Sequence, residues 1–227
     1  IPHNGNVSNG LMFALEDVQG KPIDKDYAER RARWEPIYEV TQVKGDGEAH
    51  PFLSPDDEFA DFGTWDKGNL SPFGQKPKTN DMLQYEYARS ALKLGLGQEA
   101  LTGTNPFKFG MIGSTDAHTS VATAEENNYW GKVSAIEPGI DRSSVEFFPS
   151  LSKDQAATMS WEQVASGYAA VWAEENTRES IFAAMKRKEV YATTGSRIVV
   201  RFFGGWHFQK DDVVKPDAAR TGYRKGV

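Results

Sequence analysis

The sequence contains no cysteine, which excludes disulfide bonds, thiolate metal ligands and cysteine nucleophiles together. No apolar run approaches the roughly 18 residues that a membrane-spanning helix requires. Basic residues are not in excess: the formal net charge is −6, so nothing predicts attraction to nucleic acid or to an anionic membrane surface. Glycine-rich phosphate loops, dinucleotide fingerprints and G-x-S-x-G nucleophile motifs are also missing. We therefore expect neither nucleic acid nor a membrane as a partner.

What the sequence does contain is enough apolar surface for a folded core. Of its 227 residues, 39% are hydrophobic and 12% aromatic, which argues against a disordered chain. This length fits one large domain or a piece of one. The chain opens on Ile1-Pro2-His3 and closes without a finished terminal element, so we expect it to be a piece of a longer polypeptide.

Segments with helical character alternate with segments of strand character along the chain. Capping residues, apolar spacing and charge predict helices over 25–35, 81–95, 160–175 and 177–189, and alternation predicts strands over 36–43, 107–113 and 198–203. Strands that alternate with helices are typical of an α/β fold with mainly parallel strands.

The stretch GMIGSTDAHTS places an Asp and a His two positions apart, directly after the apolar segment 107–113 that is predicted as a strand. If the loop is extended, Asp116 and His118 point the same way and can reach one ion. An imidazole nitrogen together with a hard carboxylate oxygen suits Zn, Mn or Fe. Two ligands are too few for a closed site, and His3 is the candidate for a third within this chain. The alternative is a turn-capping Asp116 beside a solvated His118.

Two basic residues and one acid lie where they could meet such a site. Lys44 follows a strand and Arg197 follows a turn, so either could bind an anionic substrate; the alternative for both is ordinary surface charge. Glu39 falls inside the strand 36–43, where burial of a carboxylate without a partner is unfavourable. It therefore either meets the site or lies at a solvated edge.

Five segments carry a resemblance to a known superfamily. They are IPHNGNVSNGLMF, PIYEVTQVKGDGEAHP, NPFKFGMIGSTDAHTS, EENNYWGK and KEVYATTGSRI, in this order along nearly the whole chain. Together they resemble a bacterial family of unknown function within the polymerase-and-histidinol-phosphatase (PHP) superfamily of metal-dependent phosphoesterases.

The resemblance implies a distorted (β/α)7 barrel, of which residues 1–227 would be the C-terminal part. It also implies one to three divalent metal ions held by His, Asp and Glu, and hydrolysis by a metal-activated water. By position, His3, Asp116 and His118 match late metal-ligand motifs, with Asp116 and His118 also the residues on which catalysis would depend. The superfamily's early H-x-H pair is absent from this sequence, which puts a complete metal cage in this chain in doubt.

The resemblance also favours a place at the pocket for Glu48 and His50 in the segment KGDGEAHP. With Lys44 and Arg197, we take them as predicted substrate-binding residues; Asp46 could orient ligands by hydrogen bonding. The alternative is a solvated loop.

Two functions from different classes follow. The first is a PHP-type metal-dependent hydrolase acting on a small, anionic phosphoester or related ester. The second is a non-catalytic module on a degenerate barrel, which binds a small anionic or sugar-like ligand through the aromatic-rich loop from Phe52 to Trp65.

Overall fold

A computed structural model describes residues 1–70, 77–120, 127, 131–133, 137–149, 157–164 and 167–226 of the chain. The fold is mixed α/β, as the sequence predicts. The chain forms two compact units, Ile1–Ser196 and Arg197–Val227. Among the described residues, no helix is long and apolar enough to cross a membrane.

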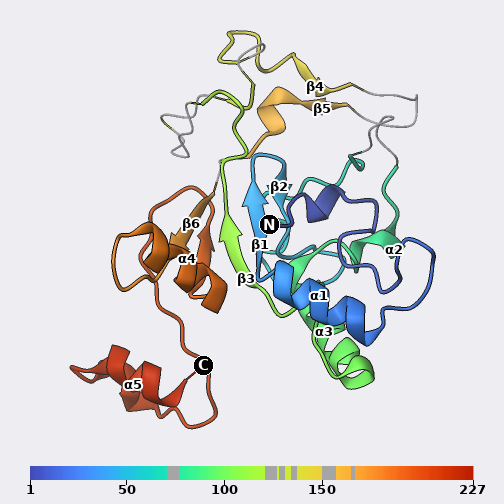
Figure 1. Cartoon of the computed structure of the whole chain (residues 1–227). Coiled ribbons are helices and arrows are strands. Elements are labelled where there is room, and N and C mark those ends of the chain that lie inside the picture. The colour runs from blue at the N-terminus through green and yellow to red at the C-terminus, as the bar shows by residue number, and fades with distance from the viewer. Residues whose placement is uncertain are drawn as a thin grey trace. The chain divides into compact units, whose positions relative to one another are not determined.

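The first unit is built around a small sheet with the order β2-β1-β3. Strand β1 (Ile37–Gln42) pairs in parallel with β3 (Gly110–Gly113), and the two lie side by side in Figure 1. It also turns back into the two-residue strand β2 (Gly45–Asp46), which pairs with it antiparallel. The parallel pair brings the carboxyl ends of β1 and β3 to one edge of the sheet.

Strand β7 (Val190–Thr193) lies along the other side of β3. A side chain built on Gly110, at the start of β3, would meet Val190, and one built on Gly113, at its end, would meet the carbonyl of Thr193. The two strands therefore run in the same direction, start beside start. Their closeness leaves no room for side chains at these two glycines.

Two further strand pairs complete the described strands. Strand β6 (Tyr168–Val171) pairs antiparallel with β7, and β4 (Glu146–Phe148) pairs antiparallel with β5 (Thr158–Met159). Of the described pairings only β1–β3 is parallel, so the prediction of mainly parallel strands is wrong for the described pairings. The described strands do not close into a barrel.

The described helices of the first unit are α1 (Lys25–Trp34), α2 (Asn80–Leu83), α3 (Ala88–Thr102) and α4 (Arg178–Arg187). Helices α1 and α3 pack against one face of β1, and α4 contacts β6. Helix α1 begins where the Asp24 carboxylate accepts a hydrogen bond from the Tyr27 amide, a typical N-cap. The buried core joins α1, β1 and α3 with the opening segment and comprises Phe13, Ile23, Ala28, Tyr38, Val40, Ala88, Ala91 and Phe107.

The alternation along β1 separates two kinds of side chain. Tyr38 and Val40 belong to the core cluster beneath the helices. Glu39 and Thr41 point to the opposite face, because successive strand residues alternate, yet both are buried. This polar, buried face is where the candidate site is found.

Three predicted elements of the first unit differ from the structure. The helix predicted over 81–95 is interrupted between α2 and α3, and the strand predicted over 107–113 begins only at Gly110. The helix predicted from Ser160 is a three-residue 3-10 helix (Ser160–Glu162), because the chain beyond it pairs as β6 with β7.

The second unit contains a 3-10 helix (Lys210–Val214) and α5 (Ala218–Lys225). Asp212 links them, since its carboxylate receives Lys215 Nζ at 2.7 Å and Lys225 Nζ at 2.6 Å. The strand predicted over 198–203 is not formed; these residues have no regular structure.

Candidate functional site

The loop that leaves β3 carries the predicted Asp–His pair. Its first amide, that of Ser114, donates to the Thr41 carbonyl at 3.0 Å, which ties the loop to the end of β1. Asp116 then adopts a left-handed backbone conformation with φ of 48°. Few residues other than glycine do so, although Asp is among the more tolerant. Non-glycine residues in this region cluster at functional sites.

Asp116 and His118 lie against each other. The Asp116 Oδ1 and His118 Nε2 atoms are 3.2 Å apart, and the His118 amide donates to the Lys132 carbonyl at 2.7 Å. The sequence therefore predicts the pairing correctly but not its cause, because Asp116 is left-handed rather than extended. Its carboxylate is mostly buried while the imidazole is largely exposed.

Two lysines converge on the same carboxylate. Lys44, from the turn between β1 and β2, forms an ion pair with Asp116 Oδ2. Lys132 Nζ lies 2.5 Å from the same oxygen and 3.2 Å from His118 Nε2. The two lysine residues are only 5% and 4% exposed. Lys44 is one of the predicted substrate-binding residues, and the structure brings it together with Asp116.

A second carboxylate supports this arrangement from beneath. Glu39 on β1 is 7% exposed, and the Ser114 hydroxyl donates to its Oε1. Its Oε2 is buried and accepts no hydrogen bond from the described residues. The charge of Glu39 acts on both Lys44 and Lys132. Of the two readings of Glu39, the structure favours the one in which it meets the site.

Burial and mutual repulsion lower the basicity of the cationic groups. Burial, followed by the charge of Lys132, lowers the pKa of Lys44 to about 7. Burial also lowers the pKa of Lys132. The pKa of His118 is lowered first by the charge of Lys132 and then by burial. A neutral imidazole, the form that can ligate a metal, is favoured as a result.

His3 stands apart from this cluster. It is exposed in the opening segment, where its Nδ1 lies 3.5 Å from the Ile1 carbonyl. The segment does run beside β1, since the Glu39 amide donates to the Pro2 carbonyl at 3.1 Å. Within the described part of the chain, however, no three His, Asp or Glu side chains gather closely enough to hold an ion.

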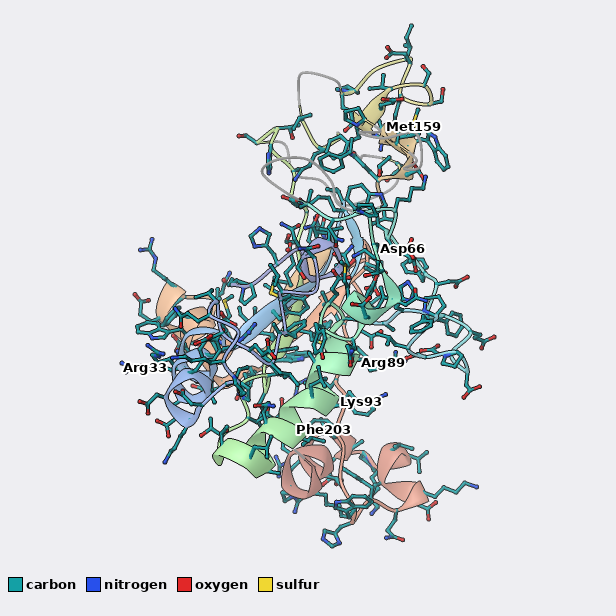
Figure 2. All side chains as sticks on the ribbon, turned by 90° about the vertical axis from the view of Figure 1, so that its right-hand side faces the viewer. Arg33, Asp66, Arg89, Lys93, Met159 and Phe203 are labelled. Carbon is teal, nitrogen blue, oxygen red and sulfur yellow. The ribbon has the colours of Figure 1, made fainter. Side chains whose placement is uncertain are left out.

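The remaining predicted residues have other partners. Arg89, on the first turn of α3 (Figure 2), binds both oxygens of Glu48, with distances of 2.9 Å and 3.0 Å. His50 Nε2 lies 3.0 Å from Asp66, while its Nδ1 accepts the Phe52 amide at 3.1 Å. Both side chains thus fix the loop after β2.

Arg197 begins the second unit. Its substrate-binding role stays a prediction, and so do the substrate-binding roles of Glu48 and His50. Residues 125, 126 and 128–130 of the EENNYWGK segment lie outside the described residues.

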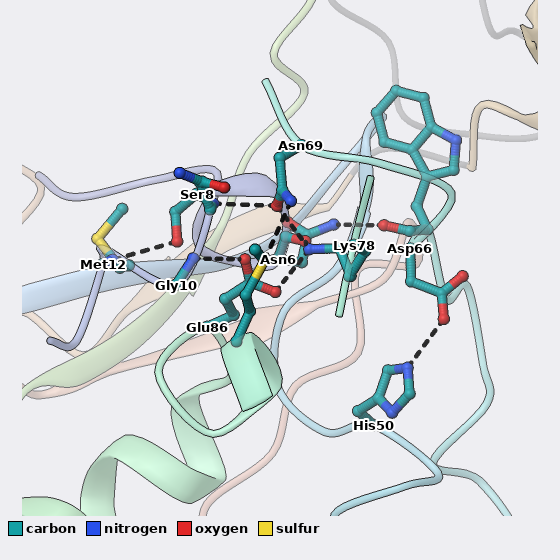
Figure 3. A network of polar contacts seen from close by, with 12 residues as sticks. Asn6, Ser8, Gly10, Met12, His50, Asp66, Asn69, Lys78 and Glu86 are labelled. Atoms are coloured by element: carbon teal, nitrogen blue, oxygen red, sulfur yellow. Dashed lines mark hydrogen bonds and ion pairs between the residues drawn. The ribbon is translucent and has the colours of Figure 1, made fainter. Parts of the chain in front are cut away.

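A buried ion pair anchors the opening loop to the rest of the first unit (Figure 3). Lys78 Nζ donates to Glu86 Oε2 at 2.6 Å, to Asn69 Oδ1 at 2.8 Å and to the Asn6 carbonyl at 2.7 Å. The other Glu86 oxygen accepts the Gly10 amide at 2.9 Å. Local sequence patterns give no sign of this network, because its members are up to 76 positions apart.

These features define a mixed α/β protein with an Asp–His–Lys cluster at the carboxyl edge of parallel strands. The chain belongs to the family described as "Protein of unknown function (DUF3604)", which matches it over residues 1–227. The comparisons with curated proteins and with solved structures gave no match.

Proposed function

We propose that this chain supplies part of the active site of a PHP-type metal-dependent hydrolase, acting on a small, anionic phosphoester or related ester. The observation that carries the proposal is the Asp116–His118 pair at the carboxyl edge of the β1–β3 sheet. In α/β proteins with parallel strands, reacting groups gather at this edge. The three neighbouring strands β1, β3 and β7, which run in the same direction, are also compatible with part of a distorted (β/α)7 barrel.

The pair fits the geometry of two ligands on one ion. With metal–ligand bonds of about 2.0–2.2 Å, neighbouring ligand atoms lie roughly 3–3.5 Å apart, and the Asp116 Oδ1 and His118 Nε2 atoms are 3.2 Å apart. The Lys132 ammonium beside both residues indicates that this position favours positive charge. The described residues thus fit one edge of a site for Zn, Mn or Fe, and further ligands would have to join them.

The residues of the site would have different roles in the reaction, according to the chemistry of their side chains. Asp116 and His118 would hold the ion, which when bound supplies an activated water and polarises the ester. Lys44 and Lys132 would bind and orient the anionic oxygens of the substrate, since their ammonium groups lie next to the ligand pair. Glu39 would keep these lysines in place through its buried charge.

Metal binding and hydrolysis test the proposal together. We expect the wild-type protein to bind Mn²⁺ or Zn²⁺ in a calorimetric titration and to hydrolyse p-nitrophenyl phosphate in their presence. His118→Ala should weaken the metal affinity by about tenfold or more, the scale seen even for outer-shell changes at metal sites, and should abolish turnover.

His207→Ala is the matched control, because His207 is an exposed histidine of the second unit. It should retain both properties. The proposal is refuted if the wild-type protein binds neither ion, or if the two histidine variants behave alike. Metal binding without any turnover would instead support the non-catalytic module.

A further inference from the structure

A cavity of about 250 Å³ opens next to Thr41 at the end of β1 and Asp46 in β2. Its walls come from the end of β1, from β2, from the aromatic-rich loop and from the segments next to β6 and β7. The residues that line it include Thr41, Asp46, Phe62, Gln163, Val164 and Thr194. We call this space the Asp46 cavity.

Backbone contacts place the Asp46 cavity at the same edge of the sheet as the candidate site. The carbonyl of Thr41 accepts the Ser114 amide, two positions before Asp116. Thr41 is also the register partner of Asp46, so their side chains share a face. On the far wall, the Val164 amide donates to the Val43 carbonyl at 3.1 Å, next to Lys44. One ligand could therefore extend from the lysines into the cavity.

The chemistry of the walls selects against an anion. No lysine or arginine is among the described residues that line the cavity. Asp46 supplies a carboxylate whose Oδ2 accepts the amides of Glu48 and Ala49, at 3.1 Å and 3.3 Å. Its Oδ1 has no hydrogen-bond partner within the described part of the chain and can accept from a ligand. Burial raises the pKa of this carboxyl to about 6.

The other walls suit a ring that carries hydroxyl groups. Hydroxyl and amide side chains, those of Thr41, Gln163 and Thr194, can both donate and accept hydrogen bonds. Phe62 and Val164 offer apolar surface to the C–H groups of such a ring. The volume is below the roughly 300–1,000 Å³ of pockets that hold drug-sized ligands, so one sugar-sized ring is the appropriate occupant.

We propose that the Asp46 cavity binds the neutral, polyhydroxylated part of the substrate, a single sugar-like or cyclitol ring, while the two lysines take its anionic group. Its role as a substrate pocket rests on the proposed hydrolase function. Ring binding itself does not, because it requires neither the metal nor turnover. The two ideas can therefore fail separately.

Ligand-observed NMR and calorimetry on the metal-free protein test this proposal. The probes are D-glucose, D-galactose and myo-inositol, with 1,6-hexanediol as an apolar-chain control. We expect at least one ring probe to bind and the diol not to bind. Val164→Phe, which fills the cavity, should weaken ring binding by about tenfold or more. Thr194→Phe should do the same from an exposed position, where a larger side chain is tolerated by the fold.

Val18→Phe is the control variant, since Val18 is 97% exposed and does not line the cavity. It should bind the ring probe like the wild type. The proposal is overturned if no ring probe binds, or if Thr194→Phe binds it as well as Val18→Phe does. If ring binding is lost in Thr194→Phe while His118→Ala and wild type show equal metal binding, the cavity is supported and the hydrolase proposal fails.

Discussion

Replacing Gly110 by Ala tests the packing of β7 against β3, on which the side-by-side arrangement of β1, β3 and β7 depends. A Cβ atom at this position would lie 2.7 Å from Val190 Cγ2 and 3.1 Å from Lys188 Cβ. Carbon atoms pack best at about 3.5–4.0 Å, so the new methyl group would overlap Val190 by roughly 1 Å. Overpacking of this kind destabilises proteins by about 1–3 kcal/mol.

Two smaller effects also contribute to the net change in the free energy of unfolding. The backbone of Gly110 has no positive φ, so alanine is not strained there. Alanine also restricts the unfolded chain, which stabilises by about 0.4–1 kcal/mol. We therefore expect Gly110→Ala to lower the free energy of unfolding by about 1–2 kcal/mol. A shift of the urea midpoint at constant slope, followed by tryptophan fluorescence, measures it.

Gly97 in α3 provides the matched control, because a Cβ atom there would meet nothing within 4 Å. Gly97→Ala should stabilise by about 0.5–1 kcal/mol. Adding Val190→Ala to Gly110→Ala removes the overlapping methyl group, so the double variant should be more stable than the sum of the single effects predicts. If Gly110→Ala matches Gly97→Ala, or if the coupling stays within about 0.3–0.5 kcal/mol of zero, β7 does not pack against β3 as described.

Two further predictions concern buried charges. Lys78→Met should lower the free energy of unfolding by about 3–5 kcal/mol, because it leaves the buried Glu86 carboxylate without its cation. Lys67→Met, which breaks the partly exposed ion pair with Glu162, should lower the free energy of unfolding by less than about 1 kcal/mol. If the two variants lose the same free energy of unfolding, the Lys78–Glu86 pair is not buried. Asp46 has a folded-state pKa of about 6 against its ordinary 3.8, so its stabilising contribution is present below pH 3.8 and is lost as the pH rises through 6. Asp46→Asn should consequently gain stability relative to wild type between pH 4 and pH 7, and a flat difference in urea midpoints would contradict the raised pKa.

The elements that the sequence predicts well are those determined by local signals. The helix predicted over 25–35 and the one over 177–189 are α1 and α4, and the strand over 36–43 is β1, each within a few residues. In these segments the apolar period, the cap and the charge pattern agree. Agreement between local and tertiary preferences is what makes such segments predictable.

The helix predicted from Ser160 fails, although a helical turn does begin at this place. The spacing of Ser160 and Gln163 predicts a capping box, but the bond that forms lies one position earlier, where the Glu162 carboxylate accepts the Met159 amide at 2.7 Å. The chain leaves the helix after one turn because Tyr168–Val171 pairs with β7, about 20 positions further on. A cap specifies where a helix begins, but not how far it extends, and long-range pairing ended this one.

The candidate site also combines residues that local signals predict with residues that only long-range contacts bring in. Spacing alone suffices to predict that Asp116 and His118 lie together. Lys132 joins them only because the His118 amide bonds to its carbonyl across 14 positions, which no local pattern indicates. Glu39 could be recognised as unusual, since a carboxylate inside a strand needs a partner, but its partners come from three separate loops.

The turn between β1 and β2 separates the two halves of the proposed site, the lysine side that would bind the anionic group and the cavity that would bind the ring. Lys44 and Asp46 lie on either side of Gly45, which has φ of 101° and would place a Cβ atom 2.5 Å from Trp65. Only glycine fits this turn, so the register of the hairpin is fixed at Thr41 and Asp46. A slip by one residue would turn Asp46 away from the cavity and move Lys44 from Asp116. The separation of an anion-binding side from a hydroxyl-binding side therefore depends on one glycine, whose constraint lies in the backbone and not in any group that would touch the substrate.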